Sequence, residues 1–497
     1  MTRPVLRALA FGAALALAAL APLTAQAAKT DLTLGMVLEP PHLDPTAGAP
    51  AAIDEVVYAN VFEGLTRIGP NGEVLPGLAA SWEISEDGRT YTFTLREGVK
   101  FHDGSTFEAE DVKFSLDRAM ADDSENAQKA LFAAIENVEA IDPKTVRITL
   151  SRPAGDLLFN LGWGDAVIVA PESAGDNKAK PIGTGPFRFA NWTKGSSLTL
   201  ERNPDYWGKA PALEKATFRF IPDPAAAVSA MLAGDVDAFP NFPAPEALPQ
   251  FEADPRFSVV VGSTEGETIL TMNNAKPPFD NPKVRQAIAH AIDRKAIIDG
   301  AMFGLGTPIG THFAPHHPAY QDLTGTYAYD PQKAKALLGE AGFPDGFKAT
   351  IKLPPPSYAR RGGEIVAAQL REVGIDLEIV PVEWGVWVPE VFKNKDFDLT
   401  IVSHTEPMDI GIYGRDDYYF NYKSDAFGEV MKQLDAEADA QKRYDLMRQA
   451  QKIIADDAVN GYLFQLAKAG VWNANVKGLW ENSPVQANDL TGVSWAE

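Results

Sequence analysis

The stretch from residue 81 to 118 constrains the fold more than any other part of the chain, because its pattern changes from strand to helix. Tyr91, Phe93 and Leu95 alternate with threonines, which is the period of a half-buried strand. From Asp111 onward, apolar residues recur at helical spacing. Helical and strand patterns go on alternating along the chain, so we expect an α/β fold.

The first residues have the pattern of an export signal. Arg3 and Arg7 supply a positive start, residues 8–21 form an apolar run, and Ala25-Gln26-Ala27 is typical of a cleavage site. The apolar run is too short to span a bilayer, which takes about 20 residues. We therefore expect residues 1–27 to be a signal peptide and the rest of the chain to be soluble outside the cytoplasm. A retained interfacial anchor is the alternative.

Cysteine is absent from the sequence. This excludes a lipid-modified N-terminal cysteine, disulfides, thiolate metal sites and cysteine nucleophiles. An exported chain without disulfides depends on its apolar core for stability. Removing 27 of the 497 residues leaves 470, and a chain of that size buries roughly three-quarters of its surface.

The formal net charge of −22 argues against nucleic acid and anionic lipid as partners. Binding phosphate groups requires clustered Lys and Arg, which an acidic surface opposes. The acidity promotes solubility, but it does not identify a ligand.

Three helices are predicted from the same N-terminal capping pattern. Asp223-Pro224, Asn281-Pro282 and Asp330-Pro331 each combine a capping side chain with proline at the first helical position. Gly234 and Gly342 stand where the first and third of these helices would end.

A further amphipathic region runs from about residue 426 to 455, and its charged residues are typical of a solvated face. Strands are predicted at 32–37, 145–150, 187–190, 198–201, 218–221, 375–380 and 398–402.

Several sequence blocks, taken in order, resemble one family. After the 81–118 stretch come Pro181-Ile182-Gly183-Thr184-Gly185-Pro186-Phe187, Leu200-Glu201-Arg202-Asn203-Pro204-Asp205-Tyr206-Trp207, Asn273-Asn274-Ala275-Lys276-Pro277-Pro278-Phe279 and Tyr329-Asp330-Pro331. From Glu39 almost to the C-terminus, the chain resembles the family 5 (peptide/nickel-type) extracellular solute-binding proteins of ABC importers.

The resemblance implies a two-lobed periplasmic-binding-protein fold of type II, with an extra subdomain in lobe I. Lobe I would comprise residues 28–64, 176–265 and 470–497, with the subdomain, 65–175, inserted in it. Lobe II would comprise residues 266–469. Two segments near 268–273 and 463–471 would cross between the lobes as the hinge.

The function implied is that of a periplasmic, monomeric substrate-binding component without catalytic residues, cofactor or metal site. It would capture a di- or oligopeptide or a peptide-like compound and deliver it to ABC permease and ATPase subunits at the inner membrane. An opine, an oligosaccharide or a nickel chelate remains open as the solute. An exported hydrolase using two carboxylates and a sensor or chaperone with the same clamp are the rival classes.

The resemblance also places two residues at the cleft. Glu39 lies in the loop after the first strand, and Trp384 follows Glu383 in a pair whose tryptophan lines the pocket. Separately, Tyr419, in the run Tyr418-Tyr419-Phe420, could supply aromatic surface to the cleft. The alternatives are a solvated acid at Glu39, a buried core position for Trp384 and packing at a lobe surface for Tyr419. Trp387 is expected to pack within the protein.

The segment from 397 to 409 is the most diagnostic for the solute. Peptide binders of the family carry a tryptophan here, and a nearby aspartate that pairs with the peptide amino terminus. This chain places His404 near the tryptophan position, followed by Thr405, while Glu406 comes one residue before the aspartate position and Asp409 two residues after it. Either carboxylate could bind the amine. The displacement counts against an ordinary peptide, because a buried ammonium needs a close acceptor.

The segment with His312, His316 and His317 could suggest a metal site, since imidazole is a common ligand. Pro315 and Pro318 would break the helix that such a site needs, so a polar surface loop is predicted instead.

Overall fold

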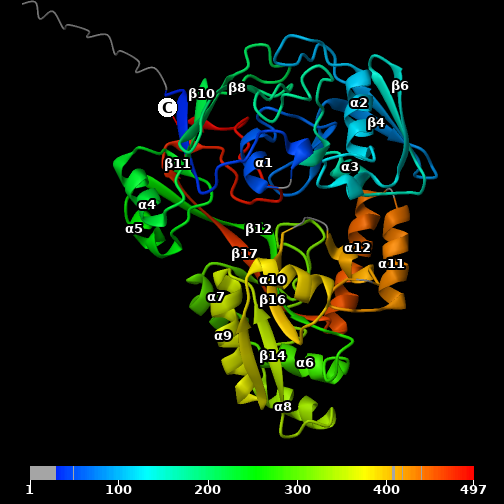
Figure 1. Cartoon of the computed structure of the whole chain (residues 1–497), viewed down its shortest axis with the longest axis vertical. Helices are drawn as coiled ribbons and strands as arrows, with labels where there is room; N and C mark the ends of the chain where they lie inside the picture. The colour runs from blue at the N-terminus through cyan, green and yellow to red at the C-terminus, as the bar shows by residue number, and fades with distance from the viewer. Residues whose placement is uncertain (1–28, 49, 406–408, 417, 438, 497) are drawn as a thin grey trace, which may run out of the picture.

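Two long antiparallel strands, β12 (Phe257–Met272) and β17 (Asn460–Asn473), run through the middle of the molecule and join its two lobes (Figure 1). The computed structural model describes residues 29–48, 50–405, 409–416, 418–437 and 439–496. The expected signal peptide lies outside these residues. Within them, no helix has both the length and the apolar character that a membrane crossing requires.

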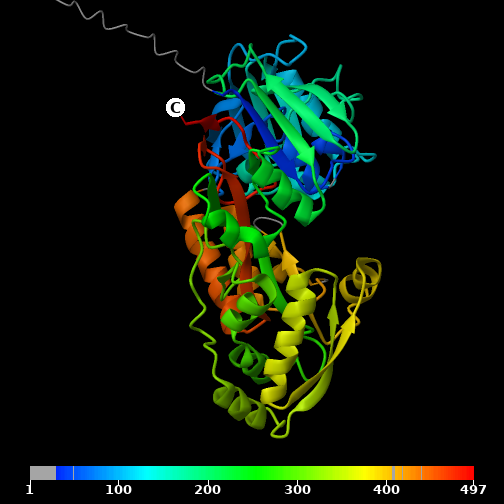
Figure 2. The ribbon, with the colours of Figure 1, turned by 90° about the vertical axis from the view of Figure 1, so that its left-hand side faces the viewer.

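One sheet extends across both lobes, because β12 and β17 belong to it along their whole length. Its strand order is β15-β14-β16-β12-β17-β11-β1-β10-β9-β8, and β13 (Thr307–Pro308) pairs with β17 off this path. The lobes lie one above the other along the longest axis (Figure 2).

Lobe I is built on β1 (Asp31–Met36), which pairs in parallel with β10 (Lys215–Phe220) and joins β17 through β11 (Ala238–Phe239). The sheet continues through the hairpin of β9 (Ser197–Arg202) and β8 (Phe187–Thr193). Its helices are α1 (Ala51–Val57), α4 (Pro224–Ala233) and α5 (Leu248–Glu252), and β18 (Val476–Lys477) pairs with β19 (Ser494–Trp495) near the C-terminus.

A separate four-stranded sheet carries the 81–118 stretch. Its order is β4 (Ala79–Ile84), β5 (Thr90–Leu95), β7 (Thr145–Leu150) and β6 (Ile135–Asp142). Tyr91, Phe93 and Leu95 are buried in the same core as the apolar face of α2 (Ala109–Met120), which confirms the predicted change from strand to helix. The short elements β2 (Thr66–Ile68), β3 (Val74–Pro76) and α3 (Leu157–Asn160) complete this region.

Lobe II surrounds β14 (Phe347–Leu353), β15 (Ile375–Pro381) and β16 (Leu399–His404), which pairs with β12. Its helices are α6 (Pro282–Ala291), α7 (Arg294–Met302), α8 (Pro331–Glu340), α9 (Ser357–Glu372), α10 (Trp384–Trp387), α11 (Asp425–Ala436) and α12 (Ala440–Asp456).

The three predicted helix starts are confirmed. The Asp223 side chain accepts a hydrogen bond from Ala226 N at 2.7 Å, and Asn281 and Asp330 cap α6 and α8 in the same way. The amphipathic region at 426–455 forms two helices instead of one. Asp439 caps the second of them by accepting a hydrogen bond from Lys442 N at 2.9 Å.

The pairing of β12 with β17 is irregular between Ser263 and Glu267, at the middle of the crossing. Ser263 N donates to the Asn482 side chain at 3.0 Å, and Ser263 Oγ lies 2.6 Å from His316 Nδ1. The other ring nitrogen of His316 bonds the carboxylate of Glu265. A lobe I segment and a lobe II histidine therefore hold the same irregular stretch of strand.

The polar surface loop predicted for the three histidines is wrong. His312 is only 1% exposed, the His316 side chain is buried at the crossing strand, and His317 stacks on Phe313 at 4.5 Å between ring centroids. Burial lowers the pKa of His317 to about 3. As the prolines predict, residues 311–318 form turns and no helix, but tertiary packing covers this segment.

Two buried carboxyl groups meet where α1 packs near the 3-10 turn Gly164–Ala166. Asp54 Oδ1 and Asp165 Oδ1 have no hydrogen-bond partner among the described residues. Burial, followed by repulsion from Asp165, raises the pKa of Asp54 well above its usual value. Burial raises the pKa of Asp165 to about 7. A raised pKa means that the folded protein holds protons that the unfolded chain releases.

We expect Asp165→Asn to stabilise the protein at pH 8 and to reduce the pH dependence of its stability. Between the usual pKa of 3.8 and about 7, the folded state binds more protons, so the free energy of unfolding falls as pH rises through this window and levels off above it. Removing the titration should raise that free energy at pH 8 by on the order of 4 kcal/mol. Denaturant unfolding from pH 4.5 to 8, in steps of about half a unit, measures it.

Asp123→Asn, at an exposed carboxylate of the same region, is the matched control and should behave like the wild type. A constant difference between wild type and Asp165→Asn across the pH range would contradict the expectation.

Candidate functional site

A cavity of about 1030 Å³ lies between the 65–175 region and lobe II. Clefts of a few hundred to about 1,000 Å³ are typical of small-molecule sites. Its lining includes Gln128, Leu131, Asn160 and Trp163 from the first region, and Trp387, Phe392, His404, Thr405, Tyr418, Tyr419 and Met431 from lobe II. Segments more than 200 residues apart in the sequence therefore share one site.

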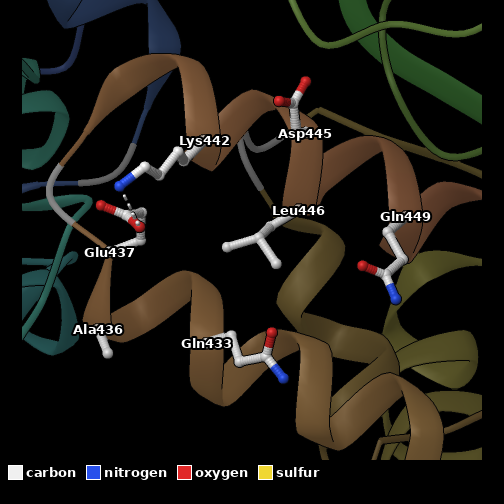
Figure 3. A pocket seen from close by; sticks show the side chains of 7 residues that line it. All are labelled: Gln433, Ala436, Glu437, Lys442, Asp445, Leu446 and Gln449. Atoms are coloured by element: carbon white, nitrogen blue, oxygen red, sulfur yellow. Dashed lines mark ion pairs between the residues drawn. The ribbon is translucent and has the colours of Figure 1, made fainter.

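A second hollow, of about 500 Å³, lies between α11 and α12 (Figure 3). Gln433, Lys442 and Gln449 border it, and only two helices of one lobe form it. The cavity between the lobes is the better candidate because two separate parts of the molecule contribute to it.

Trp387, Phe392, Tyr418 and Tyr419 form an aromatic wall on the lobe II side of the cavity. The Tyr419 ring centroid lies 5.8 Å from that of Trp387 and 5.4 Å from that of Phe392. Trp387 Nε1 donates a 2.9 Å hydrogen bond to Thr400 Oγ1 on β16, which fixes the indole. Rings held in this way offer apolar contact area at a low cost in conformational entropy.

A network of buried polar groups lies behind this wall. His404 Nε2 is 3.2 Å from the Tyr419 hydroxyl, which shares a 3.1 Å hydrogen bond with Thr271 Oγ1 on β12. The His312 ring lies 5.2 Å from the His404 ring, and His312 Nδ1 is 3.1 Å from the Tyr413 hydroxyl. The network ties the cavity floor to the crossing strand. Among the residues that the structure describes, no group of three or more His, Cys, Asp or Glu could hold a metal ion.

Three of the residues expected at the site line this cavity: His404, Thr405 and Tyr419. Glu406 lies outside the described residues. Asp409 starts a 3-10 turn, Asp409–Gly414, whose later residues line the cavity.

Trp384 and Glu39 lie apart from the cavity lining. Trp384 is 41% exposed on α10, and its ring packs edge-on against Trp387 at 5.4 Å. Glu39 stays in lobe I, where its carboxylate accepts hydrogen bonds from Trp192 Nε1 and from Gly195 N, each at 2.9 Å. That carboxylate holds the β8–β9 hairpin.

Sequence reasoning missed several lining residues. Trp387 is buried as expected, at 6% exposed, yet it also borders the cavity. Asn160 and Trp163 gave no signal because their role depends on a long-range contact with lobe II. Arg415 stands just before Tyr418 and Tyr419, and that proximity is the one local signal that could have identified it.

The 65–175 region also contacts lobe II directly, away from the crossing strands. Gly155 N donates to the Asp435 carbonyl of α11 at 3.2 Å. A Cβ atom at Gly155 would lie 1.7 Å from Arg443 Nη1 and 2.5 Å from the Glu437 carbonyl. Only glycine fits there, and the contact closes one end of the cavity.

We expect Gly155→Ala to lower the free energy of unfolding by about 1–3 kcal/mol, the usual cost of forcing an extra methyl group into a filled space. The methyl group would push Arg443 and the Glu437 backbone away. Chemical denaturation measures the loss, and small-angle scattering should show a larger radius of gyration. Gly175→Ala, where a Cβ meets nothing within 4 Å, is the control. Equal stability of the two variants would contradict the expectation.

Comparisons with known proteins identify the family of the chain. The family model described as "Bacterial extracellular solute-binding proteins, family 5 Middle" matches residues 73–425. The dipeptide-binding protein of Escherichia coli is 31% identical over 439 residues, covering 78% of this chain and 80% of its own length. The glutathione-binding protein GsiB of Pectobacterium atrosepticum is 33% identical over 347 residues, covering 68% and 67%.

Solved structures show the same two-lobed fold. HbpA2 from Haemophilus parasuis superposes with a TM-score of 0.85 at 27% identity, covering 94% of this chain and all of its own. DppA from Helicobacter pylori with the peptide STSA gives 0.74 at 28%, covering 95% and 99%. AgaA from Agrobacterium tumefaciens R10 with agropinic acid gives 0.75 at 27%, covering 94% and 99%. The expected family and fold class are confirmed: the chain belongs to the family 5 extracellular solute-binding proteins, which are binding proteins of ABC transporters.

Proposed function

We propose that this protein captures a di- or oligopeptide or a peptide-like compound in the cavity between its lobes and delivers it unaltered to a membrane permease. The observation that carries the proposal is the cavity itself. Its aromatic wall and its polar floor belong to lobe II, while Asn160 and Trp163 come from the other side. A solute held there touches both parts of a molecule whose lobes are joined by two strands.

Closure about β12 and β17 follows from this arrangement. A solute that contacts both lobes binds the closed form better and shifts the population toward it. We place the lobe boundaries near residues 266 and 469, within the crossing strands.

The named ligands of the relatives favour a peptide-like solute. Dipeptides, glutathione, the peptide STSA and agropinic acid all carry amide or amine groups together with carboxylates. We propose that the protein acts as a periplasmic monomer that serves one ABC permease and its ATPase. Two cavity carboxylates, Asp156 and Asp435, lie beside Arg152 and Arg443, an arrangement suited to ion pairing and not to hydrolysis.

A thermal-shift panel tests the proposal. The panel contains di- and tripeptides, glutathione, agropinic acid, maltotriose and nickel–histidine. A compound that binds only the folded state raises the melting temperature. We expect a shift with at least one peptide or glutathione, and mass spectrometry should recover that compound intact. Cleavage of the bound compound would favour an exported hydrolase over a binding protein. A shift with maltotriose or nickel–histidine alone would identify an oligosaccharide or a nickel chelate as the solute in place of a peptide.

We expect the Trp384→Ala variant to bind the solute identified in that panel about tenfold more weakly, a loss of about 1.4 kcal/mol in binding free energy. Trp384 lies on α10, at the end of lobe II that faces lobe I (Figure 1). It is outside the cavity lining, but its ring packs edge-on against Trp387 of the aromatic wall and supports that indole. Because the side chain is 41% exposed, its removal should leave the fold intact. Calorimetric titration measures the change.

Val386→Ala, on the same helix and 40% exposed, is the matched control and should bind like the wild type. Wild-type affinity in Trp384→Ala would remove this tryptophan from the site.

A further inference from the structure

The side of the cavity that faces lobe II is backed by a buried acid. Gln128 and Trp163 line the cavity from the 65–175 region. Asp165 comes just after Trp163, in the 3-10 turn Gly164–Ala166, and is only 5% exposed. It therefore lies behind residues that border the cavity, where it can act on them without touching a solute.

Asp165 contacts both of the segments that supply these lining residues. The Asn126 side chain donates to the Asp165 carbonyl oxygen at 2.9 Å and accepts from Gln128 N at 2.9 Å. Burial raises the pKa of the Asp165 carboxyl group to about 7, and hydrogen bonds from the backbone, including Gln128 N, and from the Trp163 side chain oppose that rise. One acidic residue thus joins the indole to the neighbouring loop.

The group that faces Asp165 from α1 is another acid. A Cβ atom at Gly164 would lie 2.3 Å from Asp54 Oδ1, so the Asp54 carboxyl group packs directly on this turn. Burial, then Asp165 and Glu55, raise the pKa of Asp54 well above its usual value. Asp54 therefore keeps its proton over a range in which Asp165 titrates, and it supplies no positive charge.

Cations on the other elements packed against this turn are used elsewhere. The 3-10 turn Pro45–Ala47 and α2 both contact Gly164–Ala166. Asp44, which caps the first of them, pairs with Arg118 of α2 at 3.3 Å. Lys129, next to Gln128, donates to a backbone carbonyl oxygen at 2.6 Å. The ionised form of Asp165 consequently depends on hydrogen bonds, and the Trp163 indole donates one of them.

The two protonation states of Asp165 differ in how firmly they hold that indole. A hydrogen bond to an ionised acceptor is roughly twice as strong as one to a neutral acceptor. Protonation also converts one carboxyl oxygen from an acceptor into a donor. An aromatic ring that is held firmly loses less conformational freedom when a solute packs on it.

We infer that Asp165 is a positioning residue for the cavity: its ionised carboxylate holds Trp163 and the Gln128 loop in the binding arrangement, and proton uptake loosens both. The inference rests on the proposed function and adds a dependence on pH to it. The protein should bind its solute more tightly above neutral pH than below it. Because ionisation of Asp165 lowers the stability of the fold, stability and affinity should change in opposite directions with pH.

The first measurement follows Trp163 without a solute. The protein is labelled with 5-fluorotryptophan, and the fluorine resonance of Trp163 is identified among those of the nine tryptophans by its loss in Trp163→Phe. In the wild type we expect this resonance to shift with pH, with a midpoint at about 7. In Asp165→Asn it should stay near the low-pH position of the wild type, because the amide is a neutral acceptor.

The second measurement is calorimetric titration of Ala-Phe and of glutathione at pH 6, 7 and 8. The probes ionise alike for every protein variant, so the ratio of wild-type affinity to Asp165→Asn affinity isolates the protein's own titration. We expect this ratio to rise about fivefold from pH 6 to pH 8, the usual difference between a charged and a neutral hydrogen bond. Asp123→Asn, at an exposed carboxylate, is the control and should follow the wild type.

Three results would overturn the inference while leaving the proposed function in place: a Trp163 resonance that does not titrate, a titration that persists in Asp165→Asn, or an affinity ratio that is constant with pH. Failure of both probes to bind at every pH would count against the proposed peptide function instead. In that case the Trp163 resonance would still decide for or against the positioning role of Asp165.

Discussion

The antiparallel pair of β12 and β17 is the constraint on which the rest of the structure depends. The two strands are hydrogen-bonded to each other, and each of them runs from one lobe into the other. The lobes are therefore joined by a narrow two-stranded ribbon of sheet. A ribbon resists stretching because its ladder must stay paired, yet it can twist or bend where the ladder is interrupted. The ladder is interrupted between Ser263 and Glu267 and again between Thr268 and Ile269, and the side chains of His316 and Asn482 bond to Ser263 at the first interruption. The regularly paired parts of the two strands hold the lobes together, and the interrupted part is where the ribbon can bend.

The cavity uses the same strands for its rigidity. Thr271 of β12 contacts Tyr419, and Tyr419 contacts His404 of β16, so the polar floor is fixed to the ribbon and not to a loop. Fixed polar groups lose little freedom when a solute arrives, which favours affinity. The opposite wall comes from the region that contains Asn160 and Trp163, and the hydrogen bond from Gly155 N to the Asp435 carbonyl joins that region to lobe II. In the proposed function, a solute that touches both walls would link binding to closure of the lobes.

Local signals in the sequence predicted much of the fold. The caps at Asp223, Asn281 and Asp330 act within one helical turn, and the alternation around Tyr91 reflects burial of one strand face, so both could be recognised without tertiary information. The prediction of a surface loop for the three histidines was wrong for the opposite reason. His312 is covered by Tyr413 and His404, which are about 100 residues away in the sequence, and nothing near it indicates burial. The candidate site followed the same division. Tyr419 was found through its aromatic neighbours, whereas Trp163 depends on a contact that only the folded chain creates.

The contact at Gly155 has a geometric consequence. It lies away from the crossing strands, and it also joins the two halves of the molecule. Two fixed points on a pair of rigid bodies define a line, and the only relative movement that preserves both points is a rotation about that line. If both contacts persist, the lobes can move only by rotation about the axis through them. One angle then describes the opening, and every accepted solute must fit the cavity at some value of that angle.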